Sequence, residues 1–295
     1  MKRKILIQNA KAICLILAAA LFFTACQNTG NAANGGFNSN MAIAVVSRED
    51  GSGTRGAFIE LLGIERDGVD HTFSEADIQN SGGAVLTAVV ANTYSIGYIS
   101  LGSLNDTVAS VSIDGVSPTA DNVRNGTYPL FRSFYFVLDG SATPNPLVQD
   151  FVAFVLSAEA QQIAAERGYI SIDDNAPPFA GSTAEGGIVI TGSTSVFPII
   201  EVLGEAFEVL NPNARIEVHS TGSSAGINAA IDGIADIGMS SRTLHDHELA
   251  QVTALEILFD GLAVIVNPAN PILDMSAETV RQIFEGEIFV WNNLE

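Results

Sequence analysis

The sequence predicts an α/β protein built from two lobes. Short apolar stretches with strand character alternate with amphipathic helical stretches over residues 41–170, and the alternation restarts at residue 188. Between them, residues 171–187 contain two prolines and three glycines without hydrophobic periodicity, as expected of a linker. Residues 26–295 are more than one lobe needs to bury its core, so we expect two lobes.

The N-terminal residues have the pattern of an export signal. Basic residues at positions 2–4 precede the apolar run "AICLILAAALFF", which is too short to span a bilayer comfortably. The next residues, "FFTAC", resemble the lipobox of bacterial lipoproteins, although Phe23 stands where leucine is usual. We expect a signal peptide over residues 1–25 and lipidation of Cys26, which would place an exported protein on the outer face of the cell membrane. An ordinary cleaved signal with an incidental cysteine is the alternative.

The composition of the predicted exported part indicates a tether and argues against a disulfide and a nucleic-acid partner. Residues 26–40 are a polar, Asn- and Gly-rich stretch that predicts a flexible tether. Cys14, the only other cysteine, lies in the signal segment, so no intramolecular disulfide is expected. Beyond residue 25 there are nine Lys and Arg against 33 Asp and Glu, a balance of -24, which argues against nucleic acid as a partner. Any anion site must therefore act through short-range donors.

The elements of the first segment follow from local patterns. Residues 43–47 form an apolar strand, and residues 54–63 continue as a helix. Residues 146–168 are predicted to form one long helix, with Pro146 near its start and Gly168 as its stop. The other predicted elements are a helix over 82–92 and strands over 95–100, 108–113 and 131–138.

In the second segment, three successive strands end in loops of Ser, Thr and Gly. Because the carboxyl ends of parallel strands share one edge of a sheet, we expect these loops to converge. A pair of buried strands and a helix capped by Ser276 are predicted to follow, over 256–268 and 276–287. The three strands and their loops are 188–191 with "GSTSV", 215–220 with "TGSS", and 235–239 with "SSRT".

Residues 47–58, "SREDGSGTRGAF", place a donor-rich loop before a helix. The free N–H groups and positive dipole end of a helix N-terminus attract anions. Ser52 and Thr54 offer hydroxyls, Gly53 offers its N–H, and the Arg48 guanidinium can hold two oxygens at once, with Asp50 expected to orient it. Taken alone, the stretch does not establish an anion site, and a glycine turn with a surface arginine and a hydroxyl N-cap is the alternative.

A small oxyanion needs more than one such loop. Stripping phosphate or sulfate of water requires about ten donors, because each exposed lone pair must find a partner. We therefore expect loops from both lobes to close on the ion. No metal or cofactor is expected, because "HDHE" at 245–248 is typical of a solvated helix start and His71 and His219 have no neighbouring ligand residues in the sequence. No enzymatic activity is expected, because no nucleophile has a recognisable base.

Five segments together resemble the extracytoplasmic phosphate-binding proteins of bacterial ABC phosphate importers. They are "SREDGSGTRGAF", "GSTSVFP", "STGSSAGI", "ADIGMSSR" and "IFEGEIFVWNNL". The resemblance covers nearly all of residues 42–295. It implies a two-lobed periplasmic-binding-protein fold of type II, phosphate in the cleft, no catalysis, and the permease and ATPase subunits of an importer as partners.

The resemblance also implies the ligands of the phosphate. From one lobe come Arg48, Ser52, Gly53 and Thr54. From the other come the Ser195 hydroxyl, the Val196 backbone N–H, Ser223 and Ser241. Some family members have an aspartate at the position of Ser241, and a serine does not repel sulfate as a carboxylate would.

The two halves stand in reverse order relative to the family. Residues 41–170 correspond to the family's C-terminal half and residues 188–295 to its N-terminal half, so we expect a circular permutation joined through residues 171–187. The alternative is a fragment of a tandem protein. A surface or sensory lipoprotein that kept the fold without transport is the alternative function.

Overall fold

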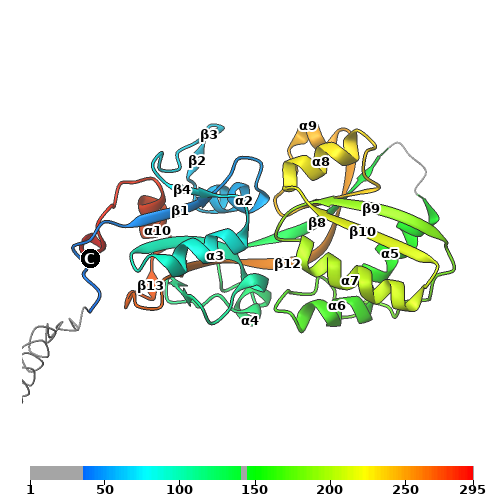
Figure 1. Cartoon of the computed structure of the whole chain (residues 1–295), viewed down its shortest axis with the longest axis horizontal. Coiled ribbons are helices and arrows are strands. Elements are labelled where there is room, and N and C mark those ends of the chain that lie inside the picture. The colour runs from blue at the N-terminus through cyan, green and yellow to red at the C-terminus, as the bar shows by residue number, and fades with distance from the viewer. Residues whose placement is uncertain (1–35, 141–144, 295) are drawn as a thin grey trace, which may run out of the picture. The chain divides into compact units, whose positions relative to one another are not determined.

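Most of the predicted strands join into one mixed sheet (Figure 1), whereas residues 112–113 of the predicted strand over 108–113 pair with residues 274–275 in a separate two-stranded sheet. A computed structural model describes residues 36–140 and 145–294, so the signal segment, Cys26 and most of the 26–40 tether lie outside the described residues. Residues 39–295 cluster as one unit, to which the following description applies.

The first segment begins with β1 and ends with a pair of helices. Its elements are β1 (Ala44–Arg48), α2 (Gly53–Leu61), β2 (Glu65–Arg66), β3 (Val69–Asp70), β4 (Asp77–Gln79), α3 (Gly82–Ala91), β5 (Ser95–Ser100), η1 (Leu101–Ser103), β6 (Ala109–Ser110), β7 (Ser112–Ile113), α4 (Ala120–Arg124), β8 (Phe131–Asp139), α5 (Pro146–Val155) and α6 (Ala158–Ala165).

The second segment begins with β9. Its elements are β9 (Gly186–Gly192), α7 (Phe197–Leu210), β10 (Ala214–Ser220), α8 (Ser223–Ile231), β11 (Ile237–Ser240), α9 (Asp246–Leu249), β12 (Val252–Val266), β13 (Asp274–Met275), α10 (Ala277–Phe284) and η2 (Trp291–Asn293).

Two groups of parallel strands make up the ends of the sheet. The strand order is β10-β9-β11-β8-β12-β5-β1-β4, with β6 paired to β12. Strands β10, β9 and β11 run parallel and are called here the β9 group. Strands β5, β1 and β4 also run parallel and are called the β1 group. The antiparallel strands β8 and β12 join the two groups.

Strand β12 passes from one group to the other. Its residues 252–261 pair with β8 and its residues 262–266 pair with β5. The prediction of two strands over 256–268 is wrong, because β12 continues as one strand through Asp260 and Gly261. A Cβ at Gly261 would lie 3.1 Å from side-chain carbons of Leu101 and Val123, so this crossing point is tightly packed.

The β9 group is covered on both faces. Phe134 and Phe136 of β8 lie in the large core that α5 and α7 complete. Val137 of β8 points to the opposite face, where it packs with Ile227 and Ala230 of α8. This alternation along one strand places α7 and α8 on opposite faces of the sheet, each at the carboxyl end of a parallel strand.

The predicted long helix over 146–168 is also wrong, because it is two helices. The Ser157 hydroxyl accepts a hydrogen bond from the Ala160 N–H and donates one to the Phe154 carbonyl, so it ends α5 and caps α6. The predicted cap at Ser276 is confirmed, since its hydroxyl accepts from the Thr279 N–H. Within residues 36–140 and 145–294, no helix has the length and apolar character that crossing a membrane requires.

Helix α8 approaches the sheet backbone closely at Gly226. A Cβ there would lie 2.5 Å from Gly192 Cα and 2.6 Å from the Thr191 carbonyl oxygen, and main-chain atoms cannot give way cheaply. Gly226→Ala should therefore destabilise the protein by about 1 to 3 kcal/mol in denaturant unfolding.

The control is Gly83→Ala in α3, where an added Cβ meets no atom within 4 Å. This variant should be as stable as the native protein or up to about 1 kcal/mol more stable. Equal unfolding free energies for the two variants would contradict the packing described for α8.

Candidate functional site

Four loops at strand ends meet at one edge of the sheet. They are residues 49–54 after β1, 193–196 after β9, 221–223 after β10 and 241–243 after β11. The β1 loop comes from the first segment and the other three come from the second. We call these the four loops.

Hydrogen bonds join the β1 loop to the loop after β9. Arg48 Nη2 donates to Thr194 Oγ1 at 3.0 Å. Thr54 Oγ1 and Ser195 Oγ are hydrogen-bonded to each other at 2.7 Å, and both residues are buried. Residues almost 150 positions apart in sequence are thus in direct contact, as the convergence argument predicts.

The β1 loop also packs against the loops after β10 and β11. A Cβ at Gly53 would lie 2.2 Å from Ser223 Oγ and 2.6 Å from Ser241 Oγ, so only glycine allows this approach. The Ser224 N–H donates to the Gly51 carbonyl at 3.2 Å. The N-terminal turn of α2 therefore lies directly against two hydroxyls of the other segment.

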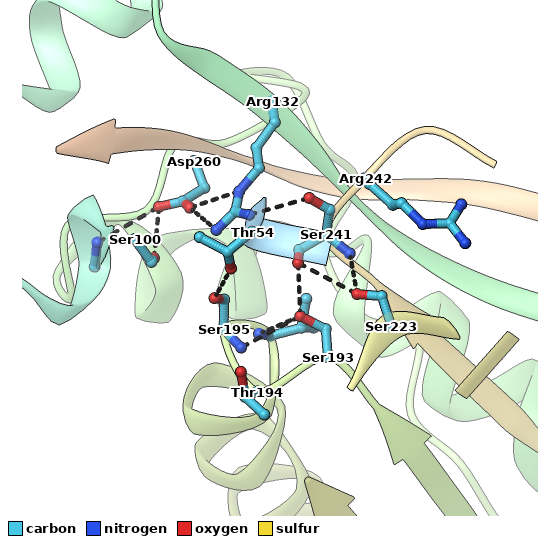
Figure 2. A network of polar contacts seen from close by, with 12 residues as sticks. Thr54, Ser100, Arg132, Ser193, Thr194, Ser195, Ser223, Ser241, Arg242 and Asp260 are labelled. Atoms are coloured by element: carbon cyan, nitrogen blue, oxygen red, sulfur yellow. Dashed lines mark hydrogen bonds and ion pairs between the residues drawn. The ribbon is translucent and has the colours of Figure 1, made fainter. Parts of the chain in front are cut away.

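The hydroxyls of the second segment form a connected cluster (Figure 2). Ser193 Oγ donates to Ser241 Oγ at 2.8 Å, and the Ser223 and Ser241 hydroxyls are 3.4 Å apart. The N–H groups of Ser195 and Val196 reach Ser193 Oγ at 3.2 and 3.4 Å. Serine hydroxyls can rotate to donate outward, so this cluster is a ready source of donors.

Arg48 is the most deeply buried arginine at the site, with 1% of its surface exposed. Its Nε and Nη2 donate to the two carboxylate oxygens of Glu49 at 2.8 and 2.9 Å, and Nε also donates to the Gln79 carbonyl. Its Nη1 is buried and has no hydrogen-bond partner among the described residues. A buried guanidinium nitrogen without an acceptor is costly, which indicates that the site is built to receive one.

Strand β5 fixes the backbone of Arg48. The Tyr98 hydroxyl accepts from the Arg48 N–H at 3.3 Å and is hydrogen-bonded to Ser47 Oγ at 2.9 Å. Burial raises the pKa of Tyr98 to about 12, so its hydroxyl stays protonated in ordinary buffers.

The expected role of Asp50 is not what the structure shows. The Asp50 side chain is 96% exposed and pairs with Arg55 at 3.0 Å, whereas Glu49 holds Arg48. The reason is the turn that follows β1: the Ser52 N–H donates to the Glu49 carbonyl, and this turn projects Asp50 outward.

All eight predicted ligand residues are buried, and the contacts above bring all four loops together. Three further residues, not expected from the sequence, also take part in the site: Ser193, Thr194 and Glu49. Two of these lie in the "GSTSV" loop, whose three neighbouring hydroxyls could not be ranked by sequence alone. Arg132 and Asp260 were also not expected, and their isolated charges inside apolar strands were the available signal.

Four arginines surround the loops, and each has a carboxylate partner. A hydrogen bond from Arg48 to Glu49 is one example, and Arg242 pairs with Glu248 at 2.8 Å in the same way. The positive charge around the site is therefore fully compensated, so donors rather than net charge would hold an anion. The complete pairs are Arg48 with Glu49, Arg55 with Asp50 and Asp70, Arg132 with Asp260, and Arg242 with Glu248.

A pocket of about 560 Å³ borders the site on its outer side. Residues of both segments line it, including Ser52 and Arg55 from one and Ser224 and Arg242 from the other. Of the eight predicted ligands only Ser52 reaches this pocket, because the others lie deeper. The inner group of hydroxyls and the Arg48 guanidinium suits a small ion rather than a bulky organic molecule.

This combination of fold and site defines a class: a binding protein that surrounds a small oxyanion with loops from two groups of strands. The comparisons with known proteins agree. The profile of the PBP superfamily domain matches residues 9–159 and 177–295. The chain is 41% identical to Phosphate-binding protein PstS 2 of Streptococcus agalactiae, over 87% of this chain and 89% of that protein.

A solved structure agrees over a similar range. The crystal structure of a phosphate ABC transporter, phosphate-binding protein from Streptococcus pneumoniae TIGR4 is 41% identical, with a TM-score of 0.71 over 86% of this chain and all of that one. Phosphate-binding protein PstS of Bacillus subtilis is 33% identical over 38% of each chain. The chain therefore belongs to the PBP superfamily and, within it, to the family of the PstS proteins.

The close approach at Gly53 gives a direct test of the site. Gly53→Ala should weaken oxyanion binding at least about tenfold, because its Cβ would displace Ser223 and Ser241 from the β1 loop. Calorimetric titration with phosphate and sulfate measures the loss, and thermal unfolding checks that the variant folds.

Two controls accompany it. Gly83→Ala makes the same substitution away from the site, and Asp50→Asn changes the exposed acid, so each should leave affinity within about threefold of the native value. A folded Gly53→Ala protein with native affinity would show that the loops need not meet for binding.

Proposed function

We propose that this protein binds inorganic phosphate outside the cell and delivers it to an ABC importer. The observation that carries the proposal is the buried Arg48 guanidinium with an unpartnered Nη1, placed among hydroxyls that converge from both segments. The guanidinium would hold one side of the ion, and the hydroxyls with the helix N-terminal N–H groups would replace its remaining water.

The names of the relatives support phosphate as the ion. The streptococcal proteins that align over most of this chain are phosphate-binding proteins, and the solved relative belongs to a phosphate ABC transporter. These relatives are transport proteins and not enzymes.

Lipid anchoring through Cys26 and docking onto permease and ATPase subunits are part of the proposal. The lipobox-like "FFTAC" supports the anchor, and membership in a transporter family supports the docking. Mass spectrometry of the N-terminal peptide from the expressed protein would detect lipid on Cys26. A peptide that begins elsewhere and carries no lipid would refute the anchor.

We also propose that the segment order is permuted relative to part of the family. The match with Bacillus subtilis PstS covers only 38% of each protein, whereas the streptococcal match is nearly full length. A match limited to one segment is expected when the two segments are exchanged. Placing residues 188–295 before 41–170 should extend the Bacillus alignment to most of both chains, and no extension would contradict the permutation.

The function is tested by titration of the protein with phosphate. Calorimetry is preferred to fluorescence, because the single tryptophan, Trp291, is buried at the start of β1 beside Tyr94 and not at the Arg48 end. The native protein should bind phosphate at one site, and Arg48→Met should lose about 2 to 5 kcal/mol of binding free energy, since a charged donor with an unpartnered Nη1 disappears from a buried site.

The matched control is Arg124→Met, which removes an arginine from an exposed ion pair with Asp121. Its affinity should stay native. Absence of heat with phosphate for the native protein would refute the proposal. Binding without stimulation of uptake by membranes that contain the importer would favour a sensory lipoprotein instead.

A further inference from the structure

A buried ion pair lies where the two groups of strands are joined. Arg132 of β8 and Asp260 of β12 are directly opposite each other in the antiparallel ladder. Arg132 Nε and Nη2 both donate to Asp260 Oδ2, at 3.1 and 2.9 Å (Figure 2). Their side chains are 4% and 0% exposed. One residue after Asp260, β12 stops pairing with β8 and begins to pair with β5.

Each partner of the pair bonds to a different side of the molecule. Asp260 Oδ1 accepts from Ser100 Oγ at 2.8 Å, at the end of β5 in the β1 group. Arg132 Nη1 donates to the Ser241 carbonyl at 3.1 Å, in the loop after β11. The pair thus bridges the end of β5 and the loop that carries a predicted phosphate ligand.

Both ends of this bridge lead to the site. Strand β5 fixes Arg48 through the Tyr98 hydroxyl. Ser241 contributes its hydroxyl to the cluster, and its N–H donates to Ser223 Oγ at 3.1 Å. The ion pair can affect the anion without touching it. On one side it is bonded to the end of β5, the strand that fixes Arg48, and on the other side to the loop that carries Ser241.

Stability alone does not explain the pair. Desolvation raises the pKa of Asp260 and lowers that of Arg132, so burial opposes both charges. Replacement of such a pair by apolar residues of similar volume is often neutral or stabilising. A pair retained at this cost, with all three donating nitrogens of Arg132 engaged, is better explained by the geometry that it fixes.

We propose that the Arg132–Asp260 pair positions Ser241 relative to Arg48 and thereby sets the affinity of the site. Arg132 is a positioning residue, because its guanidinium is bonded to Asp260 and to the Ser241 carbonyl. The inference rests on the proposed phosphate binding, and the test separates the two.

The test is a double-mutant cycle between Arg132→Lys and Ser241→Ala, with phosphate as the titrant. A lysine keeps the charge beside Asp260 but cannot bond Asp260 and the Ser241 carbonyl with the same fork. We expect Arg132→Lys to fold and to bind phosphate about tenfold more weakly. Ser241→Ala should cost about tenfold in the native background but less than about threefold beside Arg132→Lys, because the two act through one loop.

Arg124→Lys, at the exposed pair with Asp121, is the matched control and should bind normally. If Arg132→Lys does not fold, the apolar double variant Arg132→Met/Asp260→Leu replaces it in the cycle. Native affinity in a folded variant, or fully additive losses, would overturn the inference. Loss of folding in both variants would also overturn it, because the pair would then serve the fold. Absence of phosphate binding by the native protein would instead refute the proposed function.

Discussion

The contact between the β1 loop and the three loops of the second segment is the constraint on which the rest depends. Gly53 lies against Ser223 and Ser241, and Thr54 bonds Ser195, so the first turn of α2 closes onto hydroxyls from the other end of the sheet. The strand order serves this contact. Parallel strands within each group bring their loops to one edge, and the antiparallel strands β8 and β12 hold the two groups together.

Charge compensation explains how so acidic a chain can present an anion site. The part of the chain that the structure describes contains nine arginines and no lysine. The four arginines beside the site each pair with a carboxylate. The acids around the site therefore repel anions but also orient the guanidinium groups. We therefore expect binding to depend on hydrogen bonds to a dehydrated ion, which are strong at short range and insensitive to the distant negative field.

The sequence predicted the fold and the convergence of the loops because both follow from repeated local patterns. The convergence of the loops follows from two things: the strands end in Ser, Thr and Gly loops, and the carboxyl ends of parallel strands share one edge of a sheet. Whether Glu49 or Asp50 pairs with Arg48 depends on the turn closed by the Ser52 N–H, and hydrophobic periodicity does not reveal that turn. Arg132 and Asp260 were missed because their pairing is set by the register of β8 against β12, and register is a tertiary property.

If donors from both segments surround one ion, a crystal structure of the protein with phosphate will show them around it. We expect the ion within hydrogen-bond distance of Arg48 Nη1 and of hydroxyls from both Thr54 and the Ser193–Ser195 loop. An ion bound by one segment alone, or in the outer pocket between Arg55 and Arg242, would contradict it.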